Sequence, residues 1–146
     1  MDNTNRPILL GAIVLFSFSG IAQTQPYRSV MKTSWYGPGY HGNKTASGLV
    51  FNQYDPHMAA HRTLPFGTKL WLRNPTTGRS TWVVVVDRGP FIRGRALDVS
   101  ARAASILGFR RKGVQELQVS SLGRMPDYRR FFRPTNGPVT SVAMLP

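Results

Sequence analysis

The chain has 146 residues, 41% of them hydrophobic and 11% aromatic, which suits a single folded domain and excludes a mainly disordered chain. Nineteen Lys and Arg against six Asp and Glu give a net charge of +13, which predicts attraction to polyanions without specifying nucleic acid, anionic lipid or acidic envelope polymer. The absence of cysteine excludes disulfides, thiolate metal sites and a lipid-modified cysteine.

The N-terminus has the pattern of a secretory signal. A basic residue precedes a short apolar stretch, and the small residues Gly20 and Ala22 stand two apart, as a signal peptidase prefers. Crossing a bilayer takes about 20 apolar residues, so cleavage after Ala22 is favoured over an uncleaved membrane anchor. We therefore expect a signal peptide over 1–22, a linker over 23–31, and an exported protein, periplasmic or in the cell wall, that is not a lipoprotein.

Short apolar segments separated by Gly, Pro, Asn and Thr fill the middle of the chain. Their alternation and turn residues predict strands over 31–36, 68–74, 79–87, 95–100 and 114–122, with a hairpin turn at 75–78. Four consecutive valines in the third strand predict burial on both faces. Ser100 can cap one short helix that ends at Gly108. This pattern predicts a small closed β-barrel, mainly all-β with one short helix, in a domain over 32–123.

The segment 124–146 is basic and Pro-rich. It lacks clear hydrophobic periodicity, so we expect a poorly ordered or loosely docked C-terminal tail.

Three blocks together resemble a known family. They are "SWYGPGYHGNKTASGLVFN" (34–52), "MAAHRTLPFGTKLWLRNPTTGRS" (58–80) and "VVVVDRGPFIRGRALDVSARAASILGF" (83–109). The combination is similar to the rare lipoprotein A (RlpA)-like family. The resemblance implies a six-stranded double-psi β-barrel, related to expansins and some cellulases, with a groove for polysaccharide. It also implies a lytic transglycosylase that cuts peptidoglycan strands stripped of their peptides and leaves 1,6-anhydromuramyl ends.

Asp87 is the first candidate for this chemistry. It is one of six acidic residues and directly follows the valine run. From the residues alone, it could bond the backbone of Gly89 in a turn or exchange a proton with a ligand. The resemblance matches it to the functional aspartate of the "DRGP" motif. Because lytic cleavage needs a carboxylic acid that can also act as a base, Asp87 is predicted as the acid/base.

Asp98 and His61 are the supporting candidates. The resemblance places Asp98 in the substrate groove, but it could instead cap the following helix or pair with Arg95. His61 matches a functional histidine of the family, where it could orient the acid or bond a sugar hydroxyl. The alternative for His61 is a structural hydrogen-bonding role.

Candidate sugar-binding residues surround the predicted acid. Trp35, Tyr36 and Phe91 could stack on sugar rings, although two of the three are expected in the core. Arg88, beside the predicted acid, completes this set.

Two positions depart from the family pattern. Where the family has "TASGE.FD", this chain has "TASGLVFN", so Leu49 replaces a glutamate and Asn52 an aspartate. Neither side chain can exchange a proton as a carboxylic acid does. Asp55 lies three residues further on and could substitute.

Three functions therefore compete: a peptidoglycan-cleaving enzyme, a non-catalytic expansin-like wall-binding module, and a nucleic-acid binder suggested by charge alone. The secretory pattern opposes the last, so we expect glycan strands and anionic envelope polymers as partners, and no nucleic acid. His41 and His57 lie in predicted turns and are expected at the surface. The histidines lack the spacing of metal ligands and the carboxylates do not cluster, so no metal or cofactor is expected. We also expect a monomer.

Overall fold

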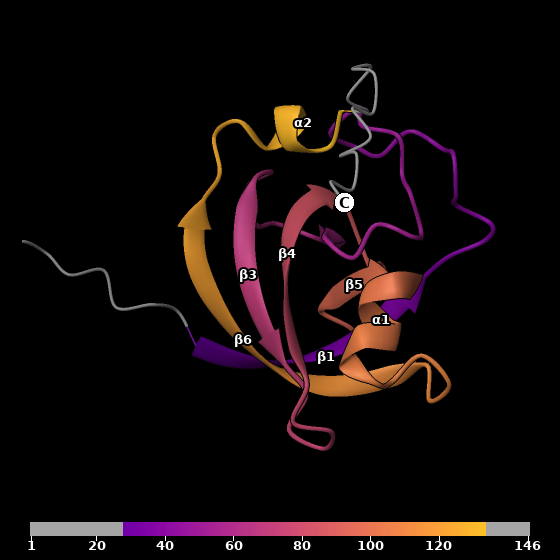
Figure 1. The fold of residues 1–146 in the computed structure, drawn as a ribbon, viewed down its shortest axis with the longest axis vertical. Helices are drawn as coiled ribbons and strands as arrows, with labels where there is room; N and C mark the ends of the chain where they lie inside the picture. Colours follow the sequence, from indigo (N-terminus) through magenta and orange to yellow (C-terminus); the bar gives the residue numbers. More distant parts are fainter. Residues whose placement is uncertain (1–27, 134–146) are drawn as a thin grey trace, which may run out of the picture.

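The computed structural model describes residues 28–133 and contains six strands and two short helices. The elements are β1 (Arg28–Tyr36), β2 (Met58–His61), β3 (Thr68–Arg73), β4 (Ser80–Asp87), β5 (Leu97–Ser100), α1 (Ala101–Leu107), β6 (Val114–Arg124) and α2 (Tyr128–Phe131). The strands close a barrel in the order β1-β5-β2-β4-β3-β6 (Figure 1). The predicted six-stranded barrel is confirmed. The predicted signal peptide over 1–22 lies outside the described residues.

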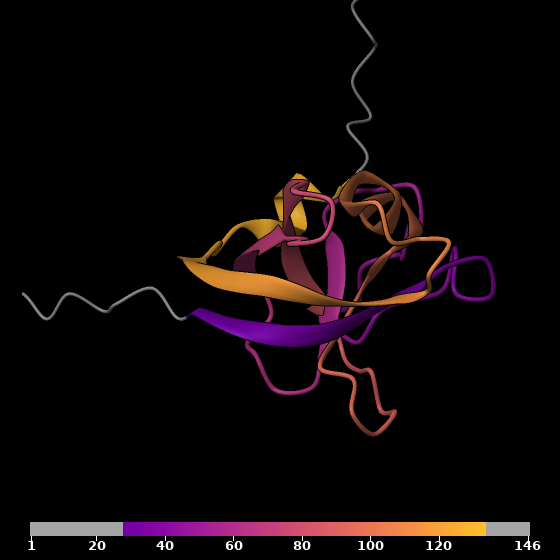
Figure 2. The same ribbon diagram turned by 90° about the horizontal axis from the view of Figure 1, so that it is seen from below.

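The barrel combines parallel and antiparallel strand pairs. The β1–β5 and β2–β4 pairs are parallel, whereas β1–β6, β2–β5, β3–β4 and β3–β6 are antiparallel. The two longest strands, β1 and β6, run side by side along one side of the molecule (Figure 2). Closure pairs every strand with two neighbours and leaves no free sheet edge.

Several elements differ from the sequence-based prediction. β1 begins at Arg28, three residues before the predicted strand, because it pairs with β6 from that residue onward. β2 was not predicted as a separate strand, since its four residues carry no clear alternation. It forms because β4 and β5 pair with it on both sides.

The valine run of β4 is buried on both faces, as predicted. Val83 and Val85 point into the barrel core, whereas Val84 and Val86 belong to a second cluster with Met58. All four valines have 0% exposure. Burying a side chain of this size contributes about 1.5–3 kcal/mol, so the four valines make a large contribution to the stability of the barrel.

Helix α1 has the predicted caps. Ser100 Oγ accepts a hydrogen bond from Ala103 N (3.1 Å), and Gly108 ends the helix in the left-handed conformation at φ 79°. Over residues 28–133, neither helix has the length and apolar character needed for a membrane crossing.

The second helix corrects the prediction for the start of the C-terminal tail. α2 lies over one end of the barrel, above β3 and β4 (Figure 1). Tyr128 is buried in the second core cluster. Phe131 packs against Trp82, and Trp82 stacks on His57 with ring centroids 3.7 Å apart. His57 is therefore half-buried rather than a free surface residue, because aromatic packing encloses its ring.

Gly67 should prove essential for docking α2. Its φ of +86° favours glycine, and an added Cβ would lie 2.7 Å from Met125 O and 2.9 Å from a Tyr128 ring carbon. Gly67→Ala should therefore lower stability by about 1–3 kcal/mol from strain alone, with a further loss from the clash. Thermal unfolding measures this effect. Gly78→Ala is the control, because Gly78 has φ +71° and nothing within 4 Å; equal losses in both variants would contradict the docking role.

Candidate active site

One row of paired residues crosses four strands of the barrel. Ser34 pairs with Asp98, Asp98 pairs with Ala60, and Ala60 pairs with Asp87. Directly paired residues share a face, so both carboxylates lie on the same face. Two strand spacings separate them, which places their Cα atoms roughly 10 Å apart.

A register shift in the β2–β4 pair creates this row. Ala59 pairs with Val85, so regular pairing would place Val86 opposite Ala60. The irregularity after Ala59 instead brings Asp87 opposite Ala60. Since successive residues of a strand face opposite sides, the bulge turns Asp87 toward the face that carries Asp98.

Both carboxylates border one pocket of about 300 Å³. Its lining combines aromatic, acidic and loop residues: Tyr36, Tyr40, Ala60, Asp87, Arg88, Gly89, Pro90, Phe91, Ile92 and Asp98. Its volume lies at the lower end of the range for ligand sites. Five of the seven predicted site residues therefore meet here, and His61 and Trp35 do not.

Asp87 holds a loop and faces the pocket at the same time. Its Oδ1 accepts hydrogen bonds from Ala46 N and Arg88 N, both at 2.8 Å. The turn alternative considered above invoked Gly89, but the partners are these two amides. Because both bonds use Oδ1, they leave Oδ2 for a ligand.

The environment of Asp98 favours the protonated form of its carboxyl group. Burial raises its pKa from the usual value of 3.8, against the lowering effects of the Ser34 hydrogen bond and the Arg95 charge. Ser34 Oγ donates to Asp98 Oδ1, and Arg95 Nη1 donates to Ser34 Oγ at 3.4 Å. Asp98 therefore does not cap helix α1, and it contacts Arg95 through Ser34.

The Tyr36 hydroxyl is buried beside the two carboxylates. Tyr36 is 9% exposed, and its hydroxyl has no hydrogen-bond partner among residues 28–133. Burial raises its pKa well above the usual value, and the charges of Asp87 and Asp98 add to the effect. Tyr36 thus stays a neutral phenol, and its buried O–H has no acceptor among the described residues. Its ring stacks on Phe51 at 4.0 Å between centroids, which fixes its position.

Arg88 lines the pocket, but its guanidinium group donates hydrogen bonds to the backbone. Its Nη1 donates to the carbonyl oxygens of His61 (3.2 Å) and Leu64 (3.0 Å), and the group lies 3.8 Å from the ring centroid of Phe66. The residue therefore secures the segment after β2 against the loop after β4.

His61 lies on the opposite face of β2 from Ala60. Its Nδ1 accepts hydrogen bonds from Thr63 N (3.2 Å) and Leu64 N (3.0 Å). Burial and the charges of Arg88 and Arg62 lower its pKa, which keeps the ring neutral at pH 7. In this position His61 shapes the turn after β2, and its catalytic role stays a prediction.

The three aromatic candidates do not all lie at the pocket. Trp35 packs against the barrel core and donates from Nε1 to Arg110 O at 3.0 Å, because it faces opposite to its neighbour Tyr36. Phe91 is 78% exposed at the pocket rim, free to stack on a sugar. Of the three, Tyr36 and Phe91 reach the pocket.

Residues 28–119 match the family model described as lytic transglycolase. The chain belongs to this family. It is 58% identical over 81 residues to the "Probable endolytic peptidoglycan transglycosylase RlpA" of Aquifex aeolicus, and 41% identical over 122 residues to the protein of the same name from a Nostoc species. These matches cover 56% and 82% of this chain, but only 35% and 30% of the two relatives.

A solved structure shares the fold of the family domain. The Streptomyces papain inhibitor superposes with a TM-score of 0.53, covering 65% of this chain and 94% of that protein. Its sequence is 19% identical, so the likeness concerns the barrel fold alone.

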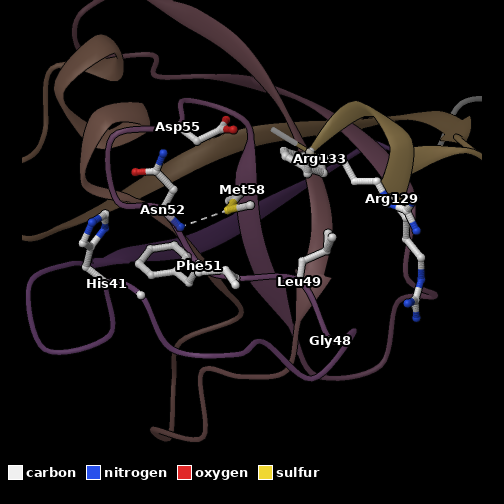
Figure 3. Close-up of a pocket in the computed structure, with 12 residues that line it drawn as sticks. His41, Gly48, Leu49, Phe51, Asn52, Asp55, Met58, Arg129 and Arg133 are labelled. Carbon is white, nitrogen blue, oxygen red and sulfur yellow. Dashed lines mark hydrogen bonds between the residues drawn. The ribbon is translucent and has the colours of Figure 1, made fainter. Parts of the chain in front are cut away.

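The two departures from the family pattern lie in a second pocket, of about 510 Å³ (Figure 3). Leu49 and Asn52 both line it, and so does Asp55. Asp55 Oδ1 accepts from His57 N at 2.8 Å. Asp55 is therefore near the positions of the missing family carboxylates, but it does not border the pocket of Asp87 and Asp98.

Sequence reasoning missed three residues of the site. Ser34 and Ala60 carry no chemical signal of their own and are identified by the strand register. Tyr40 lies in the glycine-rich segment after β1 and lines the pocket, with its ring in edge contact with Tyr36 at 5.8 Å between centroids. Over residues 28–133, no three His, Asp or Glu side chains are grouped to hold a metal ion.

Proposed function

We propose that this chain is an exported endolytic peptidoglycan transglycosylase that cleaves glycan strands lacking peptides. The observation that carries the proposal is the placement of Asp87 and Asp98 on one face, at one pocket with the Tyr36 hydroxyl. Membership of the lytic transglycolase family and the names of the relatives support the reaction class. Peptidoglycan lies outside the cytoplasm, in agreement with the secretory pattern of residues 1–22.

The proposed mechanism gives Asp98 the proton-transfer role that the sequence suggested for Asp87. Its raised pKa favours a protonated carboxyl that donates to the glycosidic oxygen as the bond from that oxygen to muramyl C1 breaks. The C6 hydroxyl of the same sugar then attacks C1 and forms the 1,6-anhydro bond. Its proton passes to the Asp98 carboxylate, so the acid is regenerated and no water is consumed.

Asp87 and Tyr36 support the charged transition state. The Asp87 carboxylate faces the pocket, where its negative charge stabilises the positive charge that develops at C1. The neutral Tyr36 O–H lies buried at the same pocket, and a small shift of the side chain toward the glycan would let it donate to a sugar oxygen. Phe91 offers an exposed ring at the rim for stacking on a neighbouring sugar.

A non-catalytic wall-binding module is the second candidate. Leu49 and Asn52 favour it, because neither can supply the carboxylate that the family carries at these positions. The two functions differ in their products. Purified chain incubated with denuded strands should release fragments with 1,6-anhydromuramyl ends, each lighter by one water than a hydrolysis product in mass spectrometry. Binding with no fragments would establish the module instead.

Tyr36→Phe should separate donation by Tyr36 from its packing. The variant keeps the stack on Phe51 and removes a buried hydroxyl without a described partner, so stability should be unchanged or slightly higher. Loss of one neutral hydrogen bond to the substrate should reduce cleavage about tenfold. Steady-state rates and thermal unfolding are measured together. A stability loss with unchanged cleavage would assign Tyr36 a purely structural role.

A further inference from the structure

The pocket beside Leu49 contains two arginines from the C-terminal segment. Arg129 on α2 and Arg133 just after it line one side, and His41 and Asn52 lie across from them (Figure 3). Both arginines are exposed and lie outside the family match over residues 28–119. We call this site the arginine pocket.

The polar groups of the arginine pocket are mostly hydrogen-bond donors. His41 Nδ1 accepts from Gln53 N, which leaves the proton of the neutral ring on Nε2. Asn52 Oδ1 accepts from Tyr54 N, which leaves its NH₂ group to donate. Arg129 uses Nε on the Tyr128 hydroxyl at 3.3 Å, so its two terminal nitrogens are available.

The remaining walls of the arginine pocket are apolar and carry little negative charge. Leu49, Phe51, Met58 and Phe132 line it, and Asp55 is its one carboxylate. One Asp55 oxygen already accepts from His57 N. Two cationic side chains therefore face a single carboxylate, and the combination suits a ligand with an anionic acceptor beside a small apolar group.

The arginine pocket lies next to the pocket of the two catalytic carboxylates. Met58 and Ala60 belong to one pocket each and are two residues apart on the same face of β2, about 7 Å along the strand. The stacked rings of Phe51 and Tyr36 lie between the pockets in the same way. The two pockets therefore share a wall of buried residues and lie close enough for one extended glycan to contact both.

We propose that the arginine pocket binds the free lactyl carboxylate of a muramyl residue in a denuded strand. This inference rests on the proposed function, since it assumes a glycan at the neighbouring pocket. The lactyl carboxylate accepts from Arg129 and Arg133, and its methyl group contacts the apolar wall near Leu49. A peptide stem would convert this carboxylate to an amide and remove the charge.

Binding of three matched glycans tests the proposal, using the full chain with Asp98→Asn to prevent cleavage. The probes are denuded strands, the same strands with lactyl carboxylates converted to methylamides, and neutral chito-oligosaccharides. Arg129→Gln with Arg133→Gln should weaken binding of the denuded strands about tenfold or more and leave the other two unchanged.

Arg130→Gln is the matched control, because Arg130 is exposed on the same helix and does not line the arginine pocket. It should retain wild-type affinity for all three probes. Equal losses on methylamide strands, or an equal loss in the control, would overturn the proposal. Cleavage by the wild type is measured separately: carboxylate selectivity without anhydro products rejects the proposed catalysis alone, whereas products without selectivity reject the arginine pocket alone.

Discussion

Replacing Asp98 with asparagine should reduce glycan cleavage by about 10²–10⁴-fold, the usual contribution of a general acid/base. Asparagine has a similar shape and can still accept the Ser34 hydrogen bond, but it cannot donate a proton and take it back. The release of 1,6-anhydromuramyl ends measures the effect. Asp127→Asn is the control, since Asp127 is exposed and makes no side-chain capping hydrogen bond. Full activity of Asp98→Asn would disprove the proton-transfer role.

At neutral pH, Asp98→Asn should be at least as stable as the wild type. Because burial raises the pKa of Asp98, the folded protein holds this proton more tightly than the unfolded chain. Wild-type stability should therefore fall as the pH rises from below the usual value of 3.8 through the pKa of the folded protein. Asp98→Asn should lack this decrease. The alkaline limb of the wild-type cleavage profile should follow the same group, which must be protonated to act as an acid.

Local sequence patterns predicted the strands whose side chains alternate or form an apolar run. The valines of β4 and the capped helix α1 have the expected burial and ends, because those features depend on neighbours in sequence. Helix α2 lacks such a pattern. It has four residues, and its position depends on Tyr128 packing against Gly67, about sixty residues away in the chain.

The sequence predicted the acidic residues of the site but not how the fold arranges them. Asp87 and Asp98 were identified from sequence, but their common face depends on the register shift after Ala59, which no local pattern reveals. Strand parity could have separated Trp35 from Tyr36 in advance, because adjacent residues of one strand face opposite sides. His61 follows the same rule next to Ala60. The burial that gives Asp98 its raised pKa also arises from tertiary packing.

Two substitutions of Asp87 should separate its structural role from its catalytic role. In Asp87→Asn, the amide oxygen can still accept from Ala46 N and Arg88 N, so the loop and the thermal stability should be retained. The negative charge near C1 is lost, and cleavage should fall by about 10²–10³-fold, as for loss of one electrostatic stabiliser. Asp87→Ala removes the acceptor as well, so it should lose cleavage and also about 1–3 kcal/mol of stability.

Comparing the two variants tests whether the charge itself matters. Cleavage rates and thermal unfolding are measured on both, with binding of denuded strands as a third readout. The asparagine variant should bind the strands with little change, because the ground-state sugar carries no positive charge at C1. If the asparagine variant cleaves normally and only the alanine variant fails, Asp87 acts by anchoring the Ala46 loop. The negative charge of Asp87 would then be dispensable for cleavage. Asp98 would be the one carboxylate of this pocket that the reaction requires.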